Sequence, residues 1–416
     1  MNRKRAVVIA VMVVGLVRAG HGGGPLVVGG RSVGLEGKPL IWDLSAPVPY
    51  RTPSAGALGK LDNAQALSRV QKLFAVWEDV PTAGIRFQNA GSIQSTGAYQ
   101  GGAVDTLMKF FAVDSSCVNG SQTPIIFDSN GSLFRQLGFD NSIIGFAGPC
   151  AIDGAGHILA AEAMLNGTWI DGNQANGEIT DNQFDHAFVH EFGHLAGLDH
   201  SQISVEVINQ PRNQCSPQLL AALPEMFPFL HCQARPDASL PMLAEDDQAW
   251  ISYLYPETVG DPEHGHVPFD QAYGVISGNI LFEDGESLVQ DGNVIAADSA
   301  GASSLQFSVV SGYLFTGNPG QQVSGTNFGG SLLGSRDPLL IGRYDVPVRA
   351  GTYDLRVERI NENFIGGSSV GPLLFPIGRP FGSGPIGVKV AAGAHVTGID
   401  IVAISGAPRF DAFEGP

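Results

Sequence analysis

Apolar side chains recur at helical spacing in three segments of the chain, which predicts three main helices. The first begins at Asp62 and the second at Thr180, and each residue has a glutamine three positions later, the spacing of a capping box. The second helix is expected to stop at Gly197. A third is expected over residues 243–254, where Pro256 ends it. Each of these helices buries one face.

Alternating apolar and polar residues predict strands in two regions. Residues 156–165 form an extended run just before the second helix. After residue 270 the pattern changes to short alternating runs separated by Gly, Asp and Pro turns. The runs lie at 275–282, 293–297, 353–358 and 396–401. This pattern predicts a small all-β sandwich.

The fold class expected from these patterns is α+β, with a twisted sheet and three main helices followed by the sandwich. The length of 416 residues suits two or three domains. The expected divisions are a signal peptide at 1–19, a flexible segment at 20–37, the α+β domain at 38–256, a linker at 257–270, the sandwich at 271–405 and a tail at 406–416.

The N-terminus has the pattern of a secretory signal peptide. Basic residues at 3–5 precede an apolar run at 6–17 and the small residue Ala19, after which cleavage is expected. A membrane anchor is the alternative, but the run is too short to cross a hydrocarbon core of about 30 Å. We therefore expect a secreted, extracellular protein without a transmembrane anchor after cleavage, with the periplasm or the cell surface as alternative locations.

Charge and cysteine content narrow the partners and the compartment. A formal net charge of −17 makes nucleic acid and anionic membranes unsuitable partners. The four cysteines, an even number, favour disulfides in an oxidising compartment. Proximity in sequence favours pairing Cys117 with Cys150 and Cys215 with Cys232. A cysteine zinc site is the rival interpretation, but the chain contains no C-x-x-C pair.

The strongest chemical signal is the string His-Glu-Phe-Gly-His-Leu-Ala-Gly-Leu-Asp-His, which begins at His190. His190 and His194 are four residues apart on a predicted helix, so both imidazoles project from the same face. Gly197 can adopt the positive φ that ends the helix, and His200 can then return as a third ligand. Three imidazoles leave the fourth zinc position for water, and Glu191 can accept a proton from that water.

With these residues, the chain resembles the metzincin metalloendopeptidases, whose zinc signature is this string. Met226-Phe227-Pro228 is similar to the methionine turn of the matrixin branch, and Ser201 after the third histidine is also matrixin-like. Met242 is a rival for the turn methionine. The resemblance implies one catalytic Zn²⁺, Glu191 as the general base, hydrolysis of peptide bonds and a protein or peptide substrate.

The resemblance also implies a substrate-binding strand before the active-site helix, with an internal strand as the alternative. The implied positions are Gly156, His157, Ile158, Leu159 and Ala160. Matrixins often bind Ca²⁺ as well, and one polar loop offers oxygen ligands, with a solvated loop as the alternative. The loop residues are Asp171, Asn173, Asn176, Glu178 and Asp181.

Some features depart from the matrixin pattern. The segment between His200 and Met226 is longer than in typical matrixins, and no cysteine precedes Cys117, so a cysteine-switch propeptide is not expected. Residues 347–355 resemble a strand entry of transthyretin-like, carboxypeptidase-regulatory-type sandwiches. The alternative function is therefore an adhesion or matrix-binding protein that uses the sandwich, with the peptidase-like domain as scaffold. In either case we expect a monomer.

Overall fold

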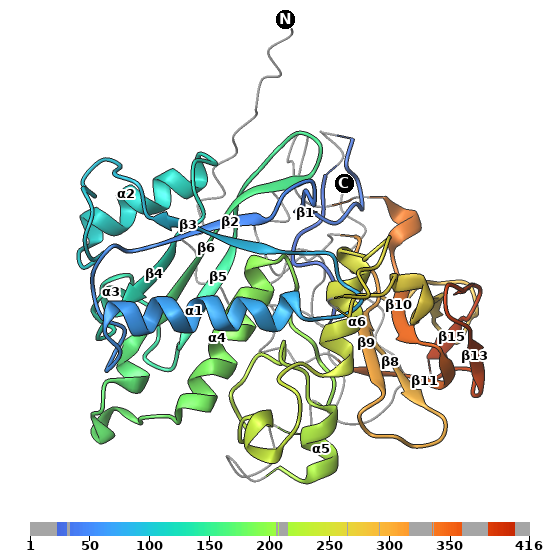
Figure 1. Ribbon diagram of the computed structural model, residues 1–416. Helices are drawn as coiled ribbons and strands as arrows, with labels where there is room; N and C mark the ends of the chain where they lie inside the picture. Colours follow the sequence, from blue (N-terminus) through green and yellow to red (C-terminus); the bar gives the residue numbers. More distant parts are fainter. Residues whose placement is uncertain are drawn as a thin grey trace, which may run out of the picture. The chain divides into compact units, whose positions relative to one another are not determined.

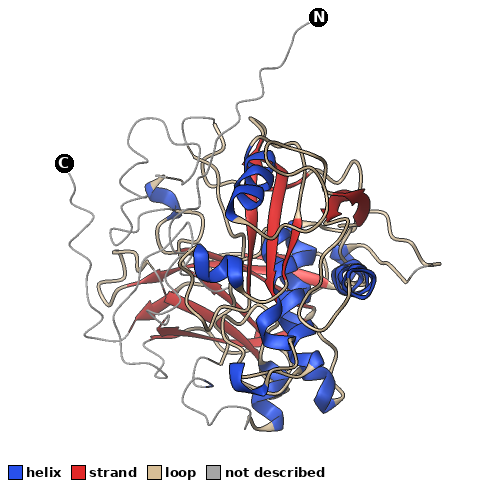
Figure 2. Ribbon diagram, turned by 90° about the vertical axis from the view of Figure 1, so that its left-hand side faces the viewer, coloured by secondary structure: helices blue, strands red, loops and turns tan. Residues whose placement is uncertain are grey.

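The structure is a computed structural model that describes residues 23–30, 34–204, 207, 215–263, 265–290, 292–315, 335, 337–359 and 382–403. It is a mixed α+β protein, as expected (Figures 1 and 2). Contacts divide the chain into two compact units. Among the described residues, the first unit comprises Ile41–Asp79 and Ile85–Gly197, and the second comprises those between 23 and 40, Val80–Gly84 and those from Leu198 to Ala403. The expected signal peptide at 1–19 and tail at 406–416 lie outside the described residues, and the expected domain boundaries stay predictions.

The main sheet of the first unit is built around one central strand. This strand, β6 (His157–Asn166), pairs in parallel with β1 (Ile41–Trp42) and β4 (Ile125–Asp128), and antiparallel with β5 (Gly145–Ile152). A separate parallel pair consists of β2 (Val48–Thr52) and β3 (Phe87–Ser92). The strand expected at 156–165 is therefore present, and it lies inside the sheet.

The first two expected helices belong to the first unit. The helices of this unit are α1 (Asn63–Glu78), α2 (Leu107–Val118), α3 (Ser132–Gln136) and α4 (Asp181–Leu195). Both expected capping boxes are formed, at Asp62 for α1 and at Thr180 for α4. Figure 1 shows α1 beside α4, where Phe74 stacks on Phe192 with ring centroids 3.8 Å apart. This stacking anchors α4 through apolar contact.

The second unit contains two further α-helices and the C-terminal strands. The helices are α5 (Pro217–Ala222) and α6 (Glu245–Leu254). The strands are β7 (Tyr273–Leu281), β8 (Gly292–Asp298), β9 (Gln306–Val310), β10 (Arg343–Arg349), β11 (Gly351–Arg359), β12 (Gly382–Ser383), β13 (Val388–Val390), β14 (His395–Val396) and β15 (Ile401–Ala403). Short 3-10 helices occur in both units, at Gly167–Ile170, Gln174–Asn176, Arg235–Ala238, Phe269–Gln271 and Pro338–Leu340.

Hydrogen bonding joins the C-terminal strands into one nine-stranded sheet, with the order β10-β7-β15-β12-β11-β8-β9 and with β13 on β11 and β14 on β7. A sandwich of two separate sheets was expected. The connection arises because β7 pairs with β10 on one edge, and with β14 and then β15 on the other. The run expected at 396–401 is divided between β14 and β15. Residues 271–405 are called the C-terminal β region below.

The segment expected to be flexible at 20–37 is held by backbone hydrogen bonds where it is described. Gly29 N–H donates to the Lys38 carbonyl at 2.8 Å, and isolated bridges join Val28 to Pro39 and Pro25 to Leu198. One of these partners, Leu198, is distant in sequence, and the flexibility of the segment stays a prediction. None of the helices in the described part of the chain is long and apolar enough to cross a membrane.

Candidate metal centre

The helix α4 carries the first two histidines of the site and is held at several points. The Trp77 Nε1–H donates to the Val189 carbonyl at 2.9 Å, and Trp42 Nε1–H donates to the Leu195 carbonyl, also at 2.9 Å. The second bond satisfies a carbonyl in the last turn, where a helix has no internal partner. The rings of His190 and His194 lie with centroids 4.7 Å apart, as expected for residues one turn apart.

The chain leaves the helix where the sequence predicted. Ala196 is the C-cap of α4, and Gly197 follows with a φ of +88°. A side chain at this position would be strained, so glycine is suited to this turn. The chain continues through Leu198 and Asp199 to His200, which is 3% exposed.

The structure brings the three expected ligands together. One potential ligand atom each from His190, His194 and His200 lies within 4.8 Å of the others, the one such group of His, Cys, Asp or Glu among the described residues. His194 and His200 are buried and His190 is half-buried. Imidazole nitrogens bind Zn²⁺ at about 2.0–2.1 Å in tetrahedral geometry, so these atoms can converge on one ion. His186, one turn before His190 on α4, is not part of this group.

Glu191 has the environment of a functional carboxyl group. It is 7% exposed, burial raises its pKa to about 8, and its Oε2 has no hydrogen-bond partner among the described residues. Gly145 at the start of β5 packs against it, since a Cβ there would lie 2.8 Å from Glu191 Cγ. An orphaned buried carboxyl oxygen costs free energy, so this one is better explained by chemistry than by stability.

The methionine turn lies beside the segment that carries His200. The Ser201 N–H donates to the Met226 carbonyl at 2.8 Å, and Asp247 accepts hydrogen bonds from the Met226 and Glu225 amides at 3.0 and 2.7 Å. Met226 is 2% exposed, whereas the rival Met242 is half-buried. These contacts favour Met226 as the turn methionine.

Both disulfides join the pairs that sequence proximity favoured. Cys117–Cys150 connects α2 to β5, with a Cα–Cα distance of 5.8 Å. Cys215–Cys232 has a Cα–Cα distance of 5.6 Å and closes a loop that includes Met226. One bridge therefore supports the strand beside Glu191, and the other supports the methionine turn.

The strand predicted to bind substrate lies between other strands, with neighbours on both sides. Residues 158–165 of β6 pair with β5 on one side, and β1 and β4 pair with its two ends on the other side. The role predicted for Gly156–Ala160 is therefore wrong, because an internal strand cannot accept another strand. Within the described residues, β5 pairs with β6 alone, so its other edge is available to a further strand.

The loop predicted to bind calcium uses several of its oxygens in local hydrogen bonds. Glu178 accepts from the Gly172 amide at 3.1 Å, Asp171 accepts from the Asn173 amide at 2.7 Å, and Asp181 pairs with Lys60 at 2.6 Å. The acidic residues of this loop are not in the metal-ligating group found among the described residues. The side chain of Asn176 lies outside the description. Calcium binding stays a prediction.

Sequence reasoning missed two residues that shape this centre. Gly145 lies far from Glu191 in sequence, and no local pattern marks a glycine that leaves room for a distant side chain. Asp247, which accepts hydrogen bonds from the Glu225 and Met226 amides, is likewise distant in sequence from the residues that it holds. No protein-family model matches this chain, and no curated protein matches it.

Proposed function

We propose that this chain is a secreted zinc-dependent endopeptidase with a metzincin-type catalytic region, acting on peptide bonds of a protein or peptide substrate. The observation that carries the proposal is the convergence of three imidazoles beside a buried carboxyl group. His190, His194 and His200 place one ligand atom each within 4.8 Å of one another. The next residue after His190 is Glu191, whose Oε2 lacks a hydrogen-bond partner among the described residues.

The three imidazoles would hold Zn²⁺, and Glu191 would move the protons. A bound zinc ion supplies Lewis-acid polarisation of the scissile carbonyl and makes a water molecule acidic near neutral pH. Glu191 takes the proton from the attacking water and delivers it to the leaving amine. Its buried position excludes bulk water from the carboxyl group, so the transfer occurs between the reacting groups.

The exposed edge of β5 is the best candidate for the substrate-binding strand. Its residues 145–149 are half-buried, and Gly145 packs directly on Glu191. A peptide added to this edge would form backbone hydrogen bonds with β5, which give affinity without selecting a sequence. The same edge would lead the peptide to the general base. This assignment replaces the one made from sequence for β6.

The test is cleavage of unfolded protein by the purified, zinc-loaded chain, with and without a chelator. We expect cleavage that the chelator stops and added zinc restores. Glu191→Gln should retain zinc and lose about 10²–10⁴ in rate, since it removes the base and keeps the ligands. The matched control is Glu162→Gln, a half-buried glutamate of the first unit whose pKa is also raised to about 8, which should retain cleavage.

Absence of cleavage by the zinc-loaded wild-type chain would contradict the proposal. Cleavage that is equal in wild type and Glu191→Gln would remove Glu191 as the base. Tight binding to matrix proteins without cleavage would favour the adhesion alternative instead.

A further inference from the structure

The short segment that carries His200 is held from both sides by distant parts of the second unit. Before His200, the Asp199 N–H donates to the Gly24 carbonyl at 2.9 Å. After it, Ser201 bonds to Met226 through its backbone and to Asp246 through its hydroxyl, which donates to Asp246 Oδ2 at 2.6 Å. The position of the third ligand therefore depends on residues that are not its neighbours in sequence.

Asp246 also connects the segment that carries His200 to the C-terminal β region through hydrogen bonds. Its second oxygen, Oδ1, accepts the Ser308 N–H at 2.7 Å, and the hydroxyls of Ser308 and Ser201 lie 3.1 Å apart. The Trp250 Nε1–H donates to the Ser308 carbonyl at 2.8 Å. Ser201 and Asp246 are 1% exposed and Ser308 is 0% exposed, so water does not compete for these bonds.

The position of β9 at the edge of its sheet explains why Ser308 forms hydrogen bonds with α6. β9 is the last strand in the order of its sheet and pairs with β8 along one edge. An edge strand has backbone groups that still need partners. At Ser308, α6 supplies both: a carboxylate from Asp246 for the N–H and an indole N–H from Trp250 for the carbonyl.

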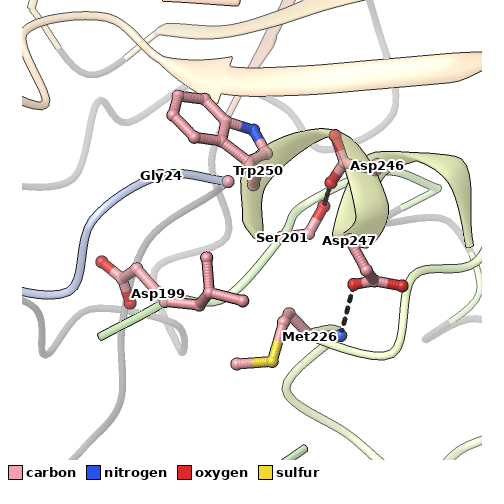
Figure 3. Close-up of a pocket in the computed structure, with 9 residues that line it drawn as sticks. Gly24, Asp199, Ser201, Met226, Asp246, Asp247 and Trp250 are labelled. Atoms are coloured by element: carbon pink, nitrogen blue, oxygen red, sulfur yellow. Dashed lines mark hydrogen bonds between the residues drawn. The ribbon is translucent and has the colours of Figure 1, made fainter. Parts of the chain in front are cut away.

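The packing around this network leaves little freedom. Figure 3 shows Asp246 bonded to Ser201 and Asp247 bonded to Met226, with Trp250 and Gly24 nearby. The cavity that these residues line has a volume of about 10 Å³, barely enough for one water molecule. A displacement of α6 is therefore expected to move the segment that contains Ser201.

We infer that the C-terminal β region helps to position the third ligand of the metal centre. In this role Ser308 and Asp246 act as positioning residues for His200, through Ser201. The inference rests on the proposed function. It assigns a role to a region that contributes no ligand and no base. Residues beyond the ligands of a metal site commonly change metal affinity by about 10–100-fold when they are mutated.

The experiment compares four variants of the full chain: Asp246→Ala, Asp246→Asn, Ser308→Ala and the control Ser311→Ala. Ser311 is also fully buried, in the same β region, and its hydroxyl bonds to the Val289 carbonyl away from the network. The zinc dissociation constant is measured by competition with a chromophoric chelator, and the absorption spectrum of the Co²⁺-loaded protein reports ligand geometry. Thermal unfolding of the zinc-free proteins reports stability separately.

Asp246→Ala should weaken zinc binding by about 10–100-fold, and Ser308→Ala by a few fold. Asp246→Asn should restore most of the affinity, because an amide can accept from Ser308 and donate to Ser201. Ser311→Ala should lower the thermal midpoint about as much as Ser308→Ala and leave zinc affinity and the Co²⁺ spectrum unchanged.

Wild-type zinc affinity in folded Asp246→Ala and Ser308→Ala would overturn the inference, as would an equal loss of affinity in Ser311→Ala. If Asp246→Ala does not fold, Ser308→Ala decides. If the wild-type chain binds no zinc, the proposed function fails. Amide hydrogen exchange at Ser201 then tests whether Ser308 holds the segment that contains Ser201. Faster exchange in Ser308→Ala supports the positioning contact, and unchanged exchange overturns it.

Discussion

The first two ligands of the candidate metal centre and the third are supported in different ways. His190 and His194 belong to α4 of the first unit, where the helix itself sets their spacing. His200 belongs to a loop of the second unit, where bonds to Gly24, Met226 and Asp246 fix its neighbours. A helix positions side chains through contacts within four residues, whereas this loop depends on contacts that only the complete fold creates.

The difference teaches where the site is vulnerable. The helical pair should survive any change that leaves α4 capped and packed on α1. The third ligand should respond to changes far away in sequence, including changes in the C-terminal β region. The predictions below test this contrast, beginning with the largest expected effect.

Removing the chain after Glu263 should have the largest effect, because it removes β9 from α6. Trp250 would lose Ser308 and Tyr313, Asp246 would lose the Ser308 amide, and Glu245 would lose its ion pair with Arg349. An aspartate that loses one of its two hydrogen-bond partners and a newly exposed tryptophan both destabilise the second unit. We expect an insoluble or partly unfolded protein, measured by size-exclusion chromatography and circular dichroism.

This expectation opposes the separable β region that a linker at 257–270 would imply. That segment bonds to the rest of the second unit, with Val267 N–H donating to the Pro81 carbonyl at 2.9 Å. A soluble truncated chain that binds zinc and cleaves peptides at the full-length rate would show that the β region is a separable domain. It would also show that His200 does not depend on contacts with that region.

Replacing individual histidines should show which imidazoles hold zinc. His194→Ala and His200→Ala should each reduce zinc from about one ion per chain to a trace after dialysis, because two imidazoles form a poor site. His186→Ala, one turn before His190 on α4, is the matched control and should retain zinc. Metal content is measured by atomic emission. Full zinc occupancy in either ligand variant would remove that histidine from the site.

The sequence predicted the parts of the site that depend on local rules. The capping boxes at Asp62 and Thr180, the turn at Gly197 and the spacing of the first two histidines all follow from interactions within a few residues. The pattern of alternating residues also located three long strands of the C-terminal β region, β7, β8 and β11. These features need no knowledge of distant contacts.

The sequence did not predict the features that depend on pairing between distant segments. The role assigned to β6 was wrong, because one strand's apolar pattern does not show how many neighbours the strand has. The contacts of Gly24 and Ser308 with the His200 segment have no local signal, since a glycine-rich stretch and a buried serine are compatible with many environments. Tertiary packing decided all of these positions.

Removing each disulfide compares the two units directly. Chain-entropy arithmetic gives a loss of about 4 kcal/mol for Cys117–Cys150 and about 3 kcal/mol for Cys215–Cys232, because the first closes the longer loop, with sequence separations of 33 and 17. Double alanine variants measure each loss by chemical denaturation. Only removal of Cys215–Cys232 should also weaken zinc binding, since its loop includes Met226. An equal loss of zinc affinity in both variants would contradict the view that the loop containing Met226 positions His200.

The last prediction concerns the pH dependence of stability, through a half-buried acid of the first unit. Burial is the main cause that raises the pKa of Glu162 to about 8, and the neighbouring Asp114 carboxyl adds to it. The folded chain therefore keeps a proton on Glu162 that the unfolded chain releases above its ordinary value of 4.5. Stability from this group is complete at low pH and is lost as pH rises toward about 8, by at most about 1.4 kcal/mol per pH unit.

Glu162→Gln should flatten this decline, because the amide keeps a hydrogen-bond donor toward Asp114 and does not titrate. The measurement is the free energy of unfolding by chemical denaturation at several values between about pH 5 and 8. Glu263→Gln, at an exposed position, is the control and should decline as the wild type does. Zinc-free protein is used throughout, so that the titration of the histidine ligands is common to all three chains. If Glu162→Gln declines as steeply as the wild type, this acid does not contribute to the pH dependence. The pH response then comes from other buried acids, such as Glu191 and Asp246, whose pKa values burial raises to about 8.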